Sequence, residues 1–319
     1  MHDILKKLGE IGVIPVVKIE KACDAVNLGK ALLAGELPVA EITFRTAAAE
    51  EAIKNMTLEL PHLLVGAGTV LNVEQVRKAV GAGARFIVAP GFNPKVVDYC
   101  IGQGIPVTPG ISSPSEIEMA LERGLEVLKF FPAGASGGLD FLKAIAAPYG
   151  SVQFIPTGGV DPSNLGQYLS NDRVLAVGGT WIAKEAAIGT GKFDEITRLA
   201  REAVAISLGF EFAHLGINKE SPEAAAADAE TFARLFSFPT KDGASSVFSA
   251  SCIEIVKTRY LGDHGHIGIS TLSIPRAIAY LSRKGVGIRP ETNKEKNGKL
   301  VAVYLDQEIA GFAIHLLQK

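Results

Sequence analysis

The stretch VLKFFPA at residues 127–133 decides the fold. It is apolar on both faces, as the strands of an all-parallel sheet are, because helices cover both sides of such a sheet. Lys129 stands inside this strand, and an isolated buried ammonium is so costly that it is paired, neutral or functional. A free amine can attack a ketone, so one interpretation is a Schiff-base lysine; the alternative is a lysine that snorkels to water from a strand end.

Similar strands recur between residues 13 and 206, separated by segments with helix-period apolar residues such as 24–34, 73–82 and 115–123. The predicted strands are 13–18, 38–45, 63–69, 85–90, 106–111, 127–132, 153–157 and 174–181. Eight strand–helix units in about 200 residues predict an α/β fold, a (β/α)8 TIM barrel. A doubly wound open sheet is the competing layout, which the lack of a GxGxxG turn after the first strand disfavours.

The pattern changes after residue 207, so we predict two domains, 1–207 and 208–319. The second contains two similar halves, which begin with FAHLGIN at 212–218 and GHIGIS at 265–270. A helix follows each start, reaching Phe236 in the first half and spanning 274–284 in the second. The strand-like segments that come next are 246–257 in the first half, and 300–305 and 311–318 in the second. This repeat predicts a smaller α+β domain of paired βαβββ modules.

The composition is that of an ordinary globular protein, with 47% hydrophobic and 21% charged residues among 319. A net charge of −2 gives no indication of a nucleic-acid or anionic-membrane partner. Cys23, Cys100 and Cys252 lie far apart, which indicates reduced thiols and not a disulfide framework. The start of the sequence has no signal-peptide pattern, and no run of about 18 apolar residues occurs. We therefore expect a cytoplasmic protein without a membrane span.

Polar residues stand near the ends of the predicted barrel strands, at the face that carries the chemistry of parallel barrels. Glu41, Thr43 and Arg45 alternate along the second strand, and so point to one side. With Lys129 in the lumen, Glu41 offers a carboxylate for proton transfer and Arg45 a planar fork for a substrate carboxylate. The alternative is a buried Glu–Arg–Lys ion network that only holds the barrel together.

The last two predicted strands each end in a glycine pair, at 158–159 and 178–179. Such pairs expose backbone N–H groups at the usual phosphate-binding position of barrel enzymes, and Thr180 adds a hydroxyl donor. One Gly-Gly pair alone is also common as a plain turn. Two pairs at these two strands favour a phosphate site.

Over residues 3–206 the chain resembles the class I 2-keto-3-deoxy-6-phosphogluconate (KDPG) / 4-hydroxy-2-oxoglutarate aldolases. The motifs that carry the resemblance are EITFRT at 41–46, GAGTVL at 66–71, PGIS at 109–112, KFFPA at 129–133, PTGG at 156–159 and GGTW at 178–181. The resemblance implies that Lys129 forms an imine with the C2 ketone and that Glu41 is the general acid and base. It implies no metal or cofactor for the aldolase, a small keto acid or sugar acid phosphate as substrate, and a homotrimer.

The same resemblance implies that Arg45 and Thr69 bind the pyruvate carboxylate, and that a set of donors at the last two strands cradles a distal phosphate. These donors are Gly159, Gly179 and Thr180. The further substrate-binding residues that it implies are Pro90, Phe131, Thr157 and Gly158. One departure is Thr180, where many family members carry serine; the hydroxyl is kept. A sugar-phosphate isomerase or epimerase without an imine is the alternative function.

Four of the six histidines fall in the last 110 residues, and two of them, His214 and His266, occupy equivalent places in the two halves. With Glu254 and His315 near the ends of the halves, they predict an N3O site for a divalent ion. The region resembles the vicinal oxygen chelate (glyoxalase/bleomycin resistance/dioxygenase) superfamily, whose modules each supply one ligand from the first strand and one from the last. His315 departs from the glutamate that catalytic members mostly carry. A metal-free regulatory or assembly module is the alternative.

Overall fold

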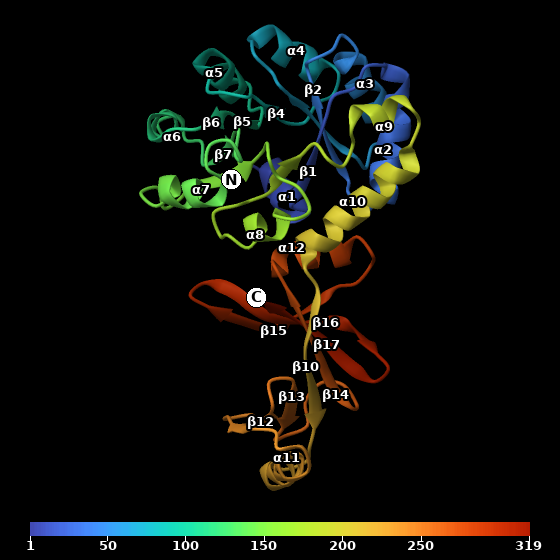
Figure 1. Ribbon diagram of the computed structural model, residues 1–319, viewed down its shortest axis with the longest axis vertical. Coiled ribbons are helices and arrows are strands. Elements are labelled where there is room, and N and C mark those ends of the chain that lie inside the picture. The colour runs from blue at the N-terminus through green and yellow to red at the C-terminus, as the bar shows by residue number, and fades with distance from the viewer. The chain divides into compact units, whose positions relative to one another are not determined.

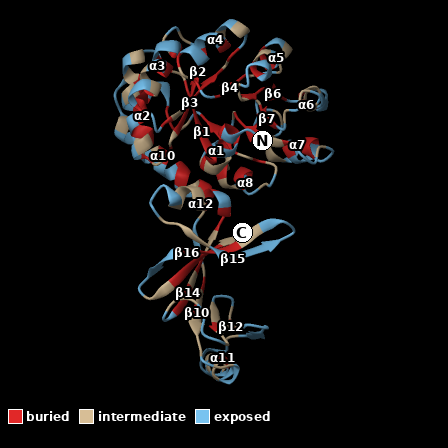
Figure 2. Cartoon of the chain, turned by 180° about the vertical axis from the view of Figure 1, so that it is seen from behind, coloured by how far each residue is buried: buried red, intermediate tan, exposed pale blue.

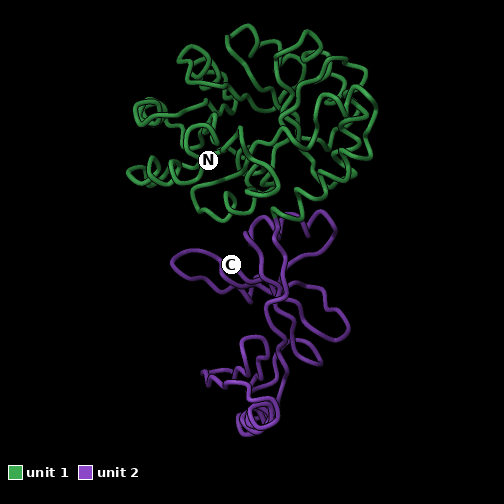
Figure 3. The backbone as a smooth tube through the Cα atoms, viewed as in Figure 1, with its two compact units in different colours: residues 1–207 green, residues 208–319 purple.

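The computed structural model describes residues 1–319, which divide into two compact units, Met1–Ser207 and Leu208–Lys319 (Figure 3). The first unit alternates strands with helices, and the second is built mainly on one large sheet (Figure 1). None of the helices is both long and apolar enough to cross a membrane.

The strands of the first unit pair in parallel throughout, which confirms the predicted parallel α/β architecture. They are β1 (Val13–Val17), β2 (Val39–Thr43), β3 (Leu64–Gly68), β4 (Ile87–Val88), β5 (Val107–Thr108), β6 (Gly110–Ile111), β7 (Val127–Phe130), β8 (Gln153–Pro156) and β9 (Val177–Gly179). Six lie in the order β5-β4-β3-β2-β1-β9, and three in the order β6-β7-β8. Two isolated bridges, Phe154 with Val174 and Thr157 with Gly178, join the chain at β8 to the chain at β9.

Helices follow the strands, and several begin at a capping side chain. They are α1 (Asp3–Ile11), α2 (Ala25–Ala34), α3 (Ala49–Glu59), α4 (Val73–Gly81), α5 (Pro94–Gly102), α6 (Pro114–Leu121), α7 (Gly138–Ala146), α8 (Leu165–Leu169), α9 (Glu185–Gly189) and α10 (Phe193–Leu208), with a 3-10 turn at Ala22–Asp24. The Asn72 side chain accepts a hydrogen bond from the Gln75 amide at the start of α4. Ser113 and Glu116 form a capping box at the start of α6, which satisfies amides that have no partner inside the helix.

The observed strands are shorter than the predicted ones, for local reasons. The predicted strand 106–111 is divided at Pro109, which has no N–H to donate to a ladder. The predicted strand 174–181 contracts to β9, and Val174 makes only its isolated bridge.

The core of the first unit lies along its strands. Every residue of β1, β2 and β7 is buried, so these strands are covered on both faces, as parallel strands are when helices flank them (Figure 2). The largest fully buried side chains of this core include Phe86, Phe130 and Phe154. Lys129 and Glu41 therefore stand on strands that are otherwise almost entirely apolar.

The second unit is an eight-stranded sheet in the order β11-β12-β13-β10-β14-β17-β16-β15. Its elements are β10 (Glu211–Asn218), α11 (Pro222–Phe236), β11 (Thr240–Asp242), β12 (Ser246–Ser249), β13 (Ile253–Val256), β14 (Gly265–Thr271), α12 (Ile274–Ser282), β15 (Ile288–Lys296), β16 (Lys299–Ile309) and β17 (Phe312–Gln318). The two central strands, β10 and β14, are antiparallel. Outside them, β10 pairs in parallel with β13, and β14 with β17.

Each half of this unit runs strand, helix and three strands, from β10 to β13 and from β14 to β17. The strand-like segment predicted at 246–257 is a pair of antiparallel strands, β12 and β13, and β11 precedes them. Strand β15 was not predicted, because its sequence IRPETNKEK is polar and mostly exposed and shows no apolar alternation.

Candidate active site

Lys129 and Glu41 face each other inside the first unit. Lys129 stands on β7 and Glu41 on β2, and they are only 5% and 3% exposed. The Lys129 Nζ lies 3.7 Å from Glu41 Oε1 and 5.1 Å from the centre of the Phe131 ring. An amine and a carboxylate thus lie side by side in the buried interior, the pairing needed for an amine nucleophile with a proton-transfer partner.

The Glu41 carboxylate packs directly against the backbone of a glycine, Gly68. A Cβ on Gly68, at the end of the neighbouring strand β3, would lie 2.0 Å from Glu41 Oε1. The same oxygen is buried and makes no hydrogen bond. The Lys129 Nζ, at 3.7 Å, lies near this oxygen but beyond hydrogen-bond distance, so the oxygen can still accept a hydrogen bond from a substrate or from a water.

The other residues predicted on β2 do not all share the position of Glu41. Thr43 is fully buried and its hydroxyl donates to the Val17 carbonyl oxygen at 2.9 Å. Arg45 lies beyond the end of β2, in the turn that follows the strand, and it is exposed. The structure therefore holds Lys129 and Glu41 together in the interior and leaves Arg45 at the rim where β2 ends.

The remaining residues predicted to bind the keto-acid end follow the ends of β3, β4 and β7. Thr69 has a φ of 54°, a conformation that non-glycine residues seldom adopt and that concentrates at functional sites. Pro90 is half-buried, and its carbonyl oxygen would lie 2.1 Å from a Cβ on Gly110. Phe131 is half-buried beside the Lys129 ammonium.

The predicted phosphate-binding residues lie at the ends of β8 and β9. Gly158 and Gly159 both have left-handed backbones, with φ of 86° and 81°, so this turn requires glycine. Thr157 is buried and is bridged to Gly178, which brings the two strand ends side by side. Gly179 is buried and Thr180 is exposed. Consecutive amides in such turns form concave sites for anions.

Two further residues were not singled out from the sequence. Gly68 belongs to the GAGTVL motif, but its contact with Glu41 joins residues 27 positions apart and has no local signal. Lys18 follows β1 at the same end of the sheet, and its ammonium pairs with Glu20 at 2.6 Å and with Glu185 at 3.1 Å. A lysine at a strand end is a signal that could have identified this position.

The sequence matches known proteins over the first unit. Residues 4–199 match the family model described as "KDPG and KHG aldolase". The chain belongs to this family. It is 48% identical over 206 residues to the 2-dehydro-3-deoxy-phosphogluconate aldolase of Treponema pallidum, covering 65% of this chain and 98% of that protein. It is 44% identical over 192 residues to the KHG/KDPG aldolase of Escherichia coli K12, covering 60% of this chain and 90% of that protein.

Solved structures of the family are similar to the same part of the chain. One is a KDPG aldolase from Legionella pneumophila with pyruvate captured as a covalent carbinolamine intermediate, 38% identical, with a TM-score of 0.61 and covering 62% of this chain and 97% of that one. Another is a 4-hydroxy-2-oxoglutarate/KDPG aldolase, 34% identical, with a TM-score of 0.59 and covering 65% and 100%. The prediction that this protein is a class I aldolase is confirmed.

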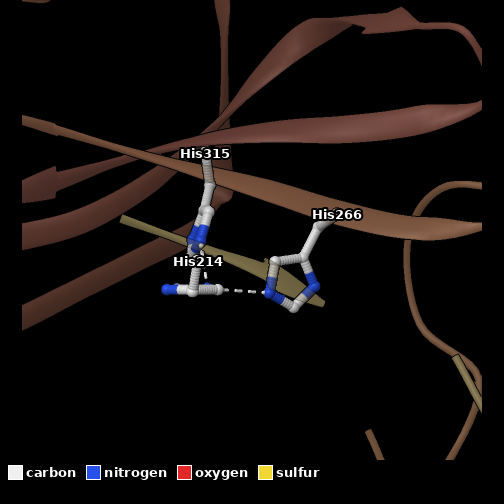
Figure 4. A group of neighbouring side chains, drawn as sticks. All are labelled: His214, His266 and His315. Atoms are coloured by element: carbon white, nitrogen blue, oxygen red, sulfur yellow. Dashed lines mark hydrogen bonds between the residues drawn. The ribbon is translucent and has the colours of Figure 1, made fainter. Parts of the chain in front are cut away.

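A second group of chemically reactive side chains lies in residues 208–319. His214, His266 and His315 come from β10, β14 and β17, and their rings point toward one another (Figure 4). The Nε2 atom of His214 lies 3.0 Å from that of His266 and 3.1 Å from that of His315. Glu254 joins them from β13, with its Oε2 3.2 Å from the Nε2 atoms of both His214 and His266. The structure thus brings together all four residues of the predicted metal site.

In this histidine cluster (His214, Glu254, His266 and His315), the protonation of His315 and of Glu254 suits metal binding. Burial, and then the neighbouring histidines, lower the pKa of His315 to about 3, so its imidazole is neutral at pH 7. Burial raises the pKa of Glu254, but hydrogen bonds from the histidines and from Ser246 outweigh burial and hold this pKa below its usual range. The Ser246 hydroxyl donates to Glu254 Oε1 at 2.7 Å, which leaves Oε2 facing the histidines. Neutral imidazole and ionised carboxylate are the forms that bind metal ions.

Proposed function

We propose that residues 1–207 cleave KDPG to pyruvate and glyceraldehyde 3-phosphate, and 4-hydroxy-2-oxoglutarate to pyruvate and glyoxylate, through an imine on Lys129. The observation that carries this proposal is the buried Lys129 Nζ 3.7 Å from Glu41 Oε1. The names of the relatives support both substrates, since the Escherichia coli protein is named for both. The electron sink is the imine, so the chemistry requires no metal ion.

Imine formation is the role we assign to Lys129. The free amine at Nζ attacks the C2 ketone of the substrate, and proton transfer gives a carbinolamine. Loss of its hydroxyl group as water leaves a protonated imine on Nζ. This cation accepts the electron pair of the C3–C4 bond when that bond breaks, so a carbanion is never formed at C3.

Proton transfer is the role we assign to Glu41. The carboxylate takes the proton of the C4 hydroxyl, directly or through a water, and the C4 carbon leaves as an aldehyde. The same proton returns to C3 of the enamine. Water then hydrolyses the imine, which releases pyruvate and restores the Lys129 amine. The position of Glu41 Oε1 supports this role, because it is buried 3.7 Å from the Lys129 Nζ and makes no hydrogen bond of its own.

The ends of the substrate are assigned to the rim residues. We propose that Arg45 and Thr69 bind the carboxylate, and that the turn at Gly158 and Gly159, with Gly179 and Thr180, binds the distal phosphate. The left-handed turn at the end of β8 supports the second assignment. Pro90, Phe131 and Thr157 complete the proposed wall of the substrate site.

The closed barrel is part of the same proposal. We infer that the two parallel sheets form one (β/α)8 barrel, since β5 and β6 are successive pieces of residues 107–111. The Thr157–Gly178 bridge supports closure on the other side, between β8 and β9. In a closed parallel barrel the residues at the carboxyl ends of different strands surround one site.

The imine is tested by trapping. The protein is incubated with pyruvate and borohydride, digested and analysed by mass spectrometry; a reduced pyruvate adduct on Lys129 is expected. Lys143→Ala, which removes an exposed lysine of α7, is the matched control and keeps the adduct. Folded protein without an adduct on Lys129 would overturn the assignment of the imine to this residue. The homotrimer stays a prediction, which sedimentation or light scattering checks.

We also propose that the histidine cluster binds a divalent metal ion. Tetrahedral bonds of about 2.0–2.2 Å to a zinc-like ion place neighbouring donor atoms about 3.3–3.6 Å apart. Four of the donor separations are 3.0, 3.1, 3.2 and 3.2 Å, and the three histidine donor atoms all lie within 4.8 Å of one another. The donor set is thus gathered at the spacing of such a site, and an ion would need it to widen by only a few tenths of an ångström. The ion would supply Lewis-acid chemistry when bound.

For residues 208–319 this donor set supports a proposal of metal binding, and we assign no reaction to it. We propose the vicinal oxygen chelate relationship on the paired βαβββ order and on the origin of the donors, from the first and last strands of each half. Metal content of the purified chain, measured by plasma mass spectrometry, tests the site. About one equivalent of a transition metal, lost in His266→Ala, is expected. A chain that stays metal-free after exposure to Zn2+ would favour the metal-free module.

A further inference from the structure

Gly216 lies on β10 directly between two of the proposed metal donors. It is the register partner of Glu254 on β13 and of His266 on β14. Strands that flank a common neighbour are about 9.5 Å apart, yet the Glu254 Oε2 and the His266 Nε2 approach to 3.2 Å. A Cβ on Gly216 would lie 2.1 Å from Cε1 and 2.3 Å from Nδ1 of His266. The His266 ring therefore leans over the backbone where any other residue would place its side chain.

Gly268 has the same relation to the other two donors. It lies on β14, with His214 as its register partner on β10 and His315 as its partner on β17. The two rings meet above it, with centres 5.0 Å apart and Nε2 atoms 3.1 Å apart. A Cβ there would lie 2.8 Å from Cε1 of His214 and 2.9 Å from Nε2 of His315. Both distances are shorter than contacts that real side chains make.

The two glycines arise from one repeated pattern. The sequence reads His214-Leu215-Gly216 on β10 and His266-Ile267-Gly268 on β14. Residues two apart on a strand share a face of the sheet. Because β10 and β14 run antiparallel, each histidine is placed beside the glycine of the other strand. Each copy of the His-X-Gly pattern thus supplies one histidine ligand, and its glycine leaves room for the histidine ring of the other strand.

Hydrogen bonding holds only one side of the His266 ring, through Nε2, which lies 3.2 Å from Glu254 Oε2 and 3.0 Å from His214 Nε2. Its Nδ1 is buried and has no hydrogen-bond partner. Ligating histidines usually donate the second ring N–H to a carboxylate, a carbonyl or a water, which sets the direction of the ring. On the Nδ1 side of the ring, the close approach to Gly216 takes the place of such a hydrogen bond, beside ring contacts with Tyr304 and His315.

We infer that Gly216 and Gly268 are positioning residues of the metal site, which let donors from flanking strands converge on one ion. The inference rests on the proposed metal binding by the histidine cluster. An alanine at either position displaces an imidazole by several tenths of an ångström or more, and metal bonds tolerate about 0.2 Å. The loss in affinity should match that of removing a supporting contact, about 10- to 100-fold.

The first test titrates the full chain, freed of metal, with Co2+ and follows visible absorption. Gly216→Ala and Gly268→Ala are expected to raise the Co2+ dissociation constant at least about tenfold. The matched control is Gly102→Ala, at the exposed end of α5, where a Cβ meets nothing within 4 Å; it should bind as the unaltered chain does. Affinity unchanged in both cluster variants would overturn the inference.

A second test needs no metal and separates this inference from the proposed metal binding. Melting temperatures are measured in chelator for Gly216→Ala, His266→Ala and the double variant. If the glycine seats the ring, Gly216→Ala destabilises the chain when His266 is present and has little further effect when the ring is gone. If the decreases in melting temperature of the two single variants add up in the double variant, Gly216 does not position the His266 ring. An unaltered chain that fails to bind Co2+ would overturn the metal proposal alone, and the double variant would still decide the role of Gly216.

Discussion

Replacing Gly68 with alanine should impair catalysis without removing any group that touches substrate. The added Cβ would lie 2.0 Å from Glu41 Oε1 and 2.7 Å from both Cδ and Cγ of the same side chain. Non-bonded contacts shorter than 3.0 Å are essentially never seen for a Cβ, so the carboxylate has to move by at least 1.0 Å. Gly68 is not in the left-handed region, so alanine brings no backbone strain of its own.

The size of the effect follows from that displacement. A misplacement of about 1 Å in a catalytic group costs about 100-fold in rate, which corresponds to about 2.7 kcal/mol of transition-state stabilisation. The loss should appear in kcat, because Glu41 acts on the bound imine. Imine formation by Lys129 should be affected less, so the borohydride adduct with pyruvate should persist.

The assay couples pyruvate release to lactate dehydrogenase and follows NADH. Gly81→Ala is the matched control, since a Cβ on this residue at the end of α4 meets nothing within 4 Å. Circular dichroism and melting temperature establish that both variants fold. A folded Gly68→Ala variant with kcat within threefold of the unaltered enzyme would show that the Glu41 carboxylate does not need its observed position.

Three further outcomes are expected. Thr180→Val, which loses only the hydroxyl, should raise KM for the phosphorylated substrate about tenfold and leave KM for 4-hydroxy-2-oxoglutarate unchanged; equal effects in the same coupled assay would argue against a phosphate contact. At pH 8 a thiol reagent should label the exposed Cys23 and Cys252 quickly, and Cys100 only after unfolding, because burial raises the pKa of the Cys100 thiol to about 11; three fast thiols by absorbance would contradict this. Zn2+ at a hundredfold excess over its dissociation constant should stabilise the chain by about 2.7 kcal/mol in thermal melts, and His315→Ala should abolish the gain; equal gains in both would place the ion elsewhere.

Much of the first unit was predictable because its strands carry a strong local signal. The run around Lys129 is apolar on both faces, and the observed β7 is buried at every position. The ends of strands were less predictable, since Pro109 interrupts a ladder that an apolar pattern alone would continue. The placement of Arg45 beyond the end of β2 could not be read from period-two alternation, which holds only while the strand lasts.

In the second unit, the internal repeat predicted which residues would gather, since His214 and His266 start equivalent halves. What the sequence did not reveal is how donors on non-adjacent strands meet. That depends on Gly216 lying opposite His266, a relation set by strand register across about 50 residues. Strand β15 was missed for a simpler reason, because its polar residues carry no apolar alternation.

The four side chains of the histidine cluster are divided equally between the two halves of residues 208–319. His214 and Glu254 come from the first half, and His266 and His315 from the second. A chain with a single half would carry only two metal donors, and would have to form a dimer to bring four donors together. Duplication within one gene replaces that concentration-dependent assembly with an intramolecular one, and each half is then free to diverge. The last strand of the first half supplies Glu254 and the last strand of the second half supplies His315. Two identical subunits would have the same residue at both positions.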